Sequence, residues 1–158
     1  NIHGGDNRFF NNIFLGLGES EEVKREGFSE SYGLHGYNIA GFNNFAEGNV
    51  YYNRAKPGEN ETNSTEISDY TPTFKIEEQD EKVILTFKLN DSVFDTETSL
   101  VTTEKLGSTI VSEAVYENPD GIAYKLNSDY KGTMREEGNP LPGPFEDMED
   151  KAVTIRVW

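Results

Sequence analysis

Short apolar and aromatic runs, punctuated by Asn and Gly, recur in the first third of the chain. Two runs carry the pattern most clearly: GGDNRFFNNIFLG (residues 4–16) and GNVYYNR (residues 48–54). Aligning them places Asn12 over Asn49 and Ile13 over Val50. An Asn at a turn bonds the local backbone and its equivalent in the next repeat. The pattern predicts parallel strands on neighbouring rungs of a solenoid, with Ile13 and Val50 pointing to a common interior.

The interval between these runs is long for one rung. A weaker run, GYNIAGFNNF (residues 36–45), lies between them, and the acidic stretch Glu19–Glu30 follows the first run. Solenoid repeats of roughly 20–45 residues are normal, so we expect one long rung, or two, with Glu19–Glu30 as an inserted loop. Unrelated strands of a β-sandwich are the alternative.

The pattern changes after a polar segment at residues 58–71. Alternating apolar positions predict strands at 73–78 and 82–89, joined by a polar turn, with Phe74 and Ile76 on the buried face. Further strands are predicted at residues 99–103, 109–116 and 152–158, with a turn at Asn118-Pro119-Asp120-Gly121.

These segments divide the chain into three parts. We predict an all-β protein: terminal β-helix rungs with an inserted loop (1–57), a polar loop (58–71), and an antiparallel cap or appended sheet (72–158). A solenoid needs such a cap because its last rung exposes an open end. The alternative for the third part is an independent carbohydrate-binding module.

Composition narrows the class of partner. The chain has 158 residues, 10 Phe, 8 Tyr, no Cys and a formal charge of −15. The aromatic content predicts a packed core, and the negative field disfavours nucleic acid and membrane surfaces as partners. No metal or cofactor motif occurs, so we predict none. The compartment, bacterial cytoplasm or secretion, and homo-oligomer formation stay open.

Four polar residues near the first runs are candidate sugar contacts. Asp6 precedes the first strand, Arg8 is placed to orient it, and His3 and His35 sit among glycines that let a ligand approach. Glu47 precedes the aligned strand and is a candidate neighbour of Asp6. The alternatives are a turn-forming Asp, a solvated Arg and loop histidines. Most aromatics between residues 32 and 52 are expected in the core.

Four segments together resemble the C-terminal portion of the β-xylosidases of glycoside hydrolase family 120. They cover about half of the chain: GGDNRFFNNIF (4–14), EGNVYYNRAKP (47–57), SLVTTEKLGSTIVSEAVYENPDG (99–121) and SDYKGTMREEGNPLPGPFE (128–146). The resemblance implies a right-handed parallel β-helix and release of xylose from short oligosaccharides by two carboxylates, with retention. It places both carboxylates before this region.

The resemblance therefore predicts a parent glycoside hydrolase, with preceding β-helix rungs of the same protein as a partner and an oligosaccharide as substrate. The 158-residue chain alone is then inactive. A β-helix polysaccharide lyase and a non-catalytic binding or adhesion module are the alternatives. The negative charge disfavours the anionic polymer of a lyase.

Overall fold

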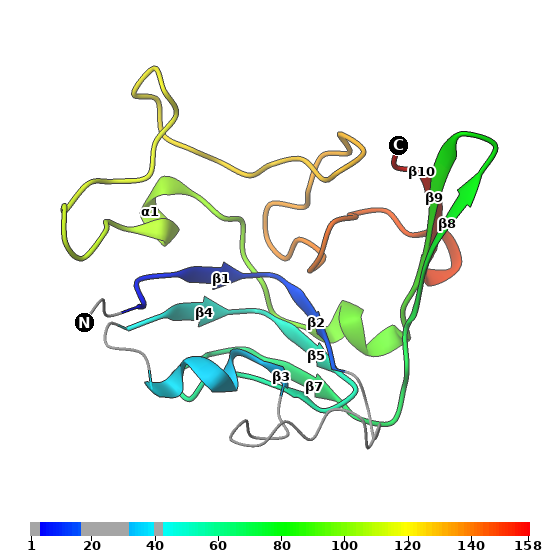
Figure 1. Ribbon diagram of the computed structural model, residues 1–158. Coiled ribbons are helices and arrows are strands. Elements are labelled where there is room, and N and C mark those ends of the chain that lie inside the picture. Colours follow the sequence, from blue (N-terminus) through cyan, green and yellow to red (C-terminus); the bar gives the residue numbers. More distant parts are fainter. Residues whose placement is uncertain (1–3, 17–31, 40–42) are drawn as a thin grey trace.

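The computed structural model describes residues 4–16, 32–39 and 43–158, and it is all-β (Figure 1). These residues form ten short strands, one four-residue α-helix, α1 (Thr103–Leu106), and three 3₁₀ segments, η2 (Leu34–Ile39), η3 (Asp91–Asp95) and η4 (Glu149–Lys151). The inserted loop predicted at Glu19–Glu30 lies outside the described residues.

Seven of the strands stack in parallel, as the Asn-aligned runs predict. Strand β1 (Arg8–Phe10) pairs with β4 (Phe45–Glu47), and β3 (Tyr32–Gly33) pairs with β6 (Ala55–Lys56). Between them, β2 (Ile13–Leu15) pairs with β5 (Val50–Tyr52), which pairs with β7 (Thr65–Ile67). We call β1–β2–β3 the first rung and β4–β5–β6 the second; β7 and the bridging residue Thr62 begin a third.

The pairing register locates the extra residues of the first rung. Arg8 pairs with Phe45 and Ile13 with Val50, both 37 positions further on, whereas Tyr32 pairs with Ala55, only 23 positions further on. The first rung is therefore longer than the second between Leu15 and Tyr32, where the second rung turns through Asn53 and Arg54.

The face that each strand turns inward differs from the prediction by one position. Phe14 stacks on Tyr51, with ring centroids 5.0 Å apart, and side chains from all three stacks meet there. This cluster is the interior of the rungs and consists of Phe9, Phe14, Leu34, Ala46, Tyr51 and Ala55.

Ile13 and Val50 are in register, as predicted, but they lie on the opposite, outward face. Successive side chains of a strand alternate between faces, so an interior built on Phe14 and Tyr51 excludes Ile13 and Val50. Both join a second cluster, to which the C-terminal half contributes Phe87, Leu89, Val93, Phe145 and Val153. The central strand β5 is thus buried on both faces.

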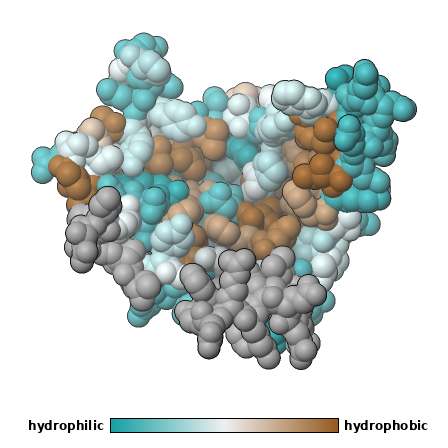
Figure 2. All heavy atoms as spheres, viewed as in Figure 1, coloured by the Kyte–Doolittle hydropathy of each residue, from teal (hydrophilic) through white to brown (hydrophobic). Residues whose placement is uncertain are grey.

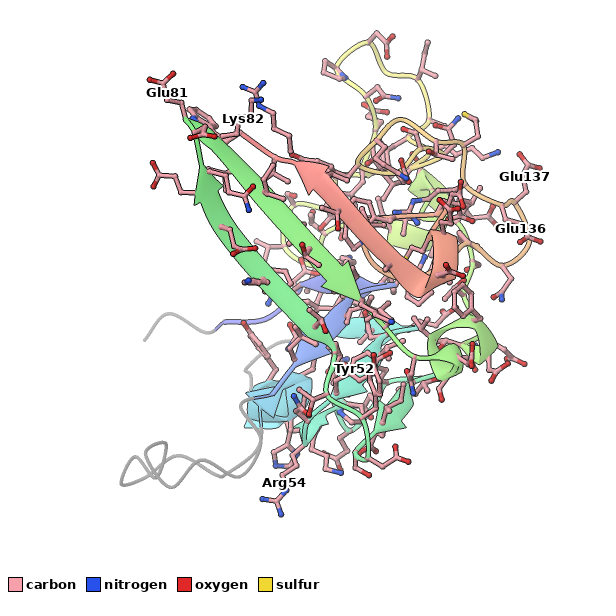
Figure 3. All side chains as sticks on the ribbon, turned by 90° about the vertical axis from the view of Figure 1, so that its right-hand side faces the viewer. Tyr52, Arg54, Glu81, Lys82, Glu136 and Glu137 are labelled. Carbon is pink, nitrogen blue, oxygen red and sulfur yellow. The ribbon has the colours of Figure 1, made fainter. Side chains whose placement is uncertain are left out.

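The predicted hairpin is confirmed. Strand β8 (Thr73–Gln79) pairs antiparallel with β9 (Lys82–Lys88), and β10 (Ala152–Arg156) pairs with the other edge of β9. Figure 3 shows Glu81 and Lys82 at the hairpin tip, far from Tyr52 near its foot. The hairpin therefore stands out beyond the strands on which its base packs.

Burial of the hairpin face is only partly as predicted. Phe87 is 5 % exposed, whereas Phe74 and Ile76, which face Phe87 and Leu85 across the ladder, are 54 % and 59 % exposed. Strand β8 is an edge of its sheet, and within that sheet only β9 and β10 contribute residues to the cluster around Phe87. The apolar face of β8 is therefore largely open.

Residues 97–147 form a long irregular segment that runs beside the first two rungs. The predicted strands at 99–103 and 109–116 do not form; isolated bridges, such as Ser108 with Val115, and α1 take their place. The predicted turn is confirmed, since the Gly121 N–H donates to the Asn118 carbonyl at 2.8 Å. Alternation in this segment does not create strands because no extended ladder is available to pair with it.

Candidate functional site

The predicted sugar contacts Asp6 and Arg8 lie together where β1 begins. The Arg8 guanidinium donates to the Asp6 carboxylate, to the Leu106 carbonyl (3.0 Å) and to the Ser108 carbonyl (2.6 Å). It also lies 4.4 Å from the Phe45 ring centroid, and its side chain is 6 % exposed. Arg8 thus joins the outward face of the first rung to the 97–147 segment.

Both oxygens of Asp6 have partners. One accepts from Arg8, and the other accepts from the Ile110 N–H at 2.8 Å. The Ile110 N–H, followed by Arg8, holds the pKa of Asp6 below its usual value. Asp6 is therefore an ionised carboxylate engaged in a structural clamp, whose part in sugar binding stays a prediction.

Glu47 pairs with a different cationic side chain from the one that pairs with Asp6. Lys105, on α1, donates to the Glu47 carboxylate at 2.7 Å and lies 5.0 Å from the Phe10 ring centroid. In the register, Glu47 pairs with Phe10, whereas the Asp6 N–H donates to the Asn43 carbonyl. Four positions along a strand span about 13 Å. The expectation that Asp6 and Glu47 are neighbours is therefore wrong.

The structure describes one of the two histidines that were predicted to contact sugar. His3 lies outside the described residues. His35 lies on η2, is exposed, and its Nδ1 is 3.3 Å from the Asn38 side-chain nitrogen. Of the predicted aromatics, Tyr51 and Tyr52 are buried, as expected for core residues, whereas Tyr37 and Phe45 are 46 % and 41 % exposed.

A small polar pocket lies beside Tyr37. It has a volume of about 60 Å³, and its polar lining is rich in side-chain amides and carboxylates: Asn38, Asn43, Asn44, Glu59, Asn60 and Glu61. Glu61 accepts from Asn49 Nδ2 at 2.8 Å and from the Tyr51 hydroxyl at 2.5 Å. Burial, followed by this carboxylate, raises the pKa of Tyr51. The pocket offers hydroxyl-binding groups, but its volume is smaller than a pyranose.

A larger hollow lies between the first rung, the hairpin and the 97–147 segment. Its volume is about 450 Å³, and most of its lining is apolar: Phe10, Ile13, Leu15, Phe74, Leu85, Phe87, Leu100, Val101, Leu126, Pro144 and Phe145, together with Asn11, Asn12, Arg135 and Gly143. In Figure 2, hydrophobic residues gather in the middle of the face that is turned to the viewer. We call it the flank hollow.

Two polar atoms at the flank hollow lack a partner. Among the described residues, the buried side-chain atoms without a hydrogen bond are Asn11 Oδ1 and Arg135 Nε, and both residues line the hollow. Sequence reasoning missed Asn11, Lys105, Ile110 and Arg135. Asn11 bonds Ser99, Lys105 bonds Glu47 and Ile110 bonds Asp6, across 58 to 104 positions, and neither spacing nor composition marks such pairs.

Two further classes of site have no support in the described part of the chain. It contains no group of three or more His, Cys, Asp or Glu placed to hold a metal ion. Within the same residues, no helix is long and apolar enough to span a membrane.

Comparison with known proteins finds a solved structure with a similar fold. No family model and no curated protein matches the chain. A solved structure described as "The complex structure of XylC with xylose" does match, with a TM-score of 0.74 over 99% of this chain. The chain therefore has the fold of the part of XylC that it matches. The sequences are 24% identical, and this chain spans 27% of the length of XylC, so the match shows the fold and not the activity.

Proposed function

We propose that this chain is the C-terminal part of a carbohydrate-active enzyme built on a right-handed parallel β-helix. Two independent observations support the proposal. The first is the parallel stack, in which β1 pairs with β4 and β2 with β5 at a spacing of 37 positions, with Asn12 bonded to Asn49 at the rung corner. The second is the fold match to XylC, a protein solved with xylose. The fold match carries the proposal because it covers nearly the whole chain.

The proposed reaction is hydrolysis of β-xylosides in plant-derived oligosaccharides. A neutral sugar suits a chain whose formal charge is −15, because this field does not oppose its approach. A polysaccharide lyase acting on an anionic polymer would work against that field. Glycoside hydrolysis therefore remains the preferred reaction class.

The proposed mechanism uses two carboxylates with retention of configuration. Retaining enzymes hold the pair about 5–5.5 Å apart, and neighbouring rungs of a β-helix are about 4.8 Å apart. Carboxylates on adjacent rungs thus match this geometry. Asp6 is held by Arg8 and Ile110, and Glu47 is held by Lys105. The resemblance to the family 120 β-xylosidases places the pair before this region, so we assign it to rungs that precede this chain.

The predicted sugar contacts remain part of the proposal. His3 and His35 would donate hydrogen bonds to sugar hydroxyls, and Asp6 and Arg8, which also hold the 97–147 segment against the first rung, would be the other two contacts. The exposed Tyr37, which packs against Phe9 with ring centroids 5.4 Å apart, adds a face for stacking beside His35.

The test uses the extended polypeptide, by which we mean this chain together with the residues encoded before Asn1. We expect it to hydrolyse an aryl β-xyloside, and proton NMR of the first turnover to show β-xylose before mutarotation. An aryl α-xyloside is the matched control and stays intact. Absence of hydrolysis with any neutral aryl glycoside, or cleavage of a uronate polymer by elimination, would overturn the proposal.

A further inference from the structure

Strand β8 is an edge of the sheet β10–β9–β8, and it forms the outer side of that sheet in Figure 3. It pairs with β9 alone among the described residues. Its two apolar side chains, Phe74 and Ile76, are each more than half exposed. An edge strand with unpaired backbone groups and exposed apolar side chains is a template for pairing with a further strand.

The hydrogen bonds of Val83, on β9, show which backbone groups of β8 face outward. The Val83 N–H donates to the Trp158 carbonyl at 3.0 Å, and the Val83 carbonyl accepts from the Val157 N–H at 2.8 Å. Both groups therefore point away from β8, where Glu78 is the partner of Val83 in the register. Glu78 and Val83 thus form a non-hydrogen-bonded pair, and the N–H and C=O of Glu78 point to the open edge.

The same orientation recurs at every second residue of β8. Hydrogen-bonded and non-hydrogen-bonded pairs alternate along an antiparallel ladder, so the backbone groups of Phe74 and Ile76 also point to the open edge. The backbone groups of Lys75 and Glu77 point to β9 instead. The side chains of Lys75 and Glu77 form an ion pair at 2.8 Å on the face opposite that of Phe74 and Ile76.

The order of these charges selects one partner. When two identical strands pair antiparallel about a two-fold axis through Ile76, Lys75 lies opposite the partner's Glu77, and Glu77 lies opposite the partner's Lys75. Ile76 is also the midpoint of Thr73–Gln79, so this register pairs the whole strand. An axis through Lys75 or through Glu77 would set two like charges face to face.

We propose that β8 is a dimerisation edge, at which two copies of this polypeptide join their sheets antiparallel into one sheet of six strands. The backbone of Ile76 exchanges two hydrogen bonds with the partner's Ile76, and Phe74 bonds the partner's Glu78. On one face the Ile76 side chains of the two copies cover each other. On the other face Lys75 and Glu77 of both copies form a cluster of alternating charge. This inference does not depend on the proposed function.

The charge pattern favours a second copy over other partners and over an edge that stays unpaired. Charged residues on an edge strand can prevent pairing. The order of Lys75 and Glu77 attracts a second copy, however, in the one register that uses the whole strand. A peptide of another protein would need the same spacing of acid and base, which a second copy has by symmetry. The formal charge of −15 opposes association, but charges more than about 8 Å apart are largely screened at physiological ionic strength.

The experiment exchanges these charges in the extended polypeptide and measures the dissociation constant of the dimer by sedimentation velocity. Lys75→Glu leaves only acidic side chains at the two positions, and Glu77→Lys leaves only basic ones. We expect each variant alone to raise the dissociation constant at least about 10-fold. An equimolar mixture of the two variants should restore the wild-type value, because every acid then faces a base.

Arg156→Glu is the matched control. Arg156 is an exposed base on β10, at the far edge of the same sheet, and its replacement changes the charge of the chain as much as Lys75→Glu does. It should leave the dissociation constant unchanged. Glu77→Lys separates the proposal from general repulsion: it reduces the negative charge of the chain, and would strengthen any association that this charge alone limits.

Hydrogen exchange at single-residue resolution gives a second readout that needs no substitution. As the protein concentration rises through the dissociation constant, the amides of Phe74, Ile76 and Glu78 should exchange at least about 10-fold more slowly, whereas those of Lys75 and Glu77 should change little. A monomer at about 100 μM, an assembly that neither single variant weakens, or a mixture that fails to restore association would each overturn the proposal. A dimer of this kind that cleaves no glycoside would refute the proposed function alone.

Discussion

Asn12 and Asn49 lie one above the other at the same corner of adjacent rungs. The side-chain oxygen of Asn49 accepts from the backbone N–H of Asn12 at 2.7 Å and from its side-chain amide at 3.0 Å. The Asn49 amide in turn donates to the Phe9 carbonyl and to Glu61, both at 2.8 Å. One fully buried side chain thus ties together two rungs and the start of the third.

Replacing Asn49 should be costly. We expect Asn49→Ala to lower the free energy of unfolding by about 3 kcal/mol, because it leaves buried partners unpaired and opens a small cavity. Asn44→Ala is the matched control: Asn44 also bonds an Asn 37 positions earlier, Asn7, but at an exposed site. Its cost should stay below about 1 kcal/mol. Urea unfolding measures both free energies, and equal costs would show that burial of the Asn49 corner adds no stability.

At Gly16 the backbone of the second rung leaves no room for a side chain. Its N–H donates to the Tyr52 carbonyl at 2.9 Å, and a Cβ at this position would lie 2.1 Å from the Asn53 carbonyl oxygen. We expect Gly16→Ala to cost about 3 kcal/mol, because backbone and not side chain must shift. At Gly58 a Cβ would meet nothing closer than 3.6 Å, so Gly58→Ala should be nearly neutral. A neutral Gly16→Ala in urea unfolding would contradict the stacking described.

Asp129 organises the turn before the proline-rich segment. Its carboxylate accepts from the backbone N–H groups of Lys131, Thr133 and Glu146, at 2.8–2.9 Å, and the residue is 8 % exposed. Burial raises the pKa of Asp129, but the three N–H donors and Lys131 outweigh it, so the pKa lies below the usual 3.8. The folded chain therefore holds this proton less tightly than the unfolded chain.

The stability that Asp129 contributes should be lost in acid. It is fully present above the unfolded-state pKa, and it falls as the pH drops through the lowered folded-state value. We expect Asp129→Asn to cost about 2 kcal/mol at pH 7, since an amide cannot accept all three bonds, and to cost progressively less toward pH 3. The matched control is Asp80→Asn, which also removes one negative charge from the chain but lies at the exposed hairpin turn. A cost independent of pH would contradict this role.

Local patterns in the sequence predict the pairing of strands but not which face is buried. The Asn-aligned runs fix Ile13 opposite Val50, and alternation around a polar turn fixes the hairpin. Assigning the interior requires knowing that β5 is covered on both faces, since Ile13 and Phe14 are both apolar. The sequence pattern could not predict the exposure of Phe74 either, because it does not show which strand forms the edge of the sheet.

The candidate site was less predictable than the fold because its contacts join distant residues. Arg8 was expected to pair with Asp6, two positions away, and it does. Its bonds to Leu106 and Ser108, and the pairing of Lys105 with Glu47, cross 58 to 100 positions. Charges are numerous in this chain, so no composition argument selects these partners. The orphaned atoms of Asn11 and Arg135 become visible only once burial is known.

The activity of the 158-residue chain, measured beside that of the extended polypeptide, tests the central claim most directly. A catalytic pair must be held to within about 0.5 Å of productive geometry by supporting rungs, and we place that pair before Asn1. The short chain should therefore leave an aryl β-xyloside uncleaved while the extended polypeptide cleaves it. Turnover by the short chain at an ordinary enzyme rate, abolished by Asp6→Asn, would contradict the account and place the active site within these 158 residues.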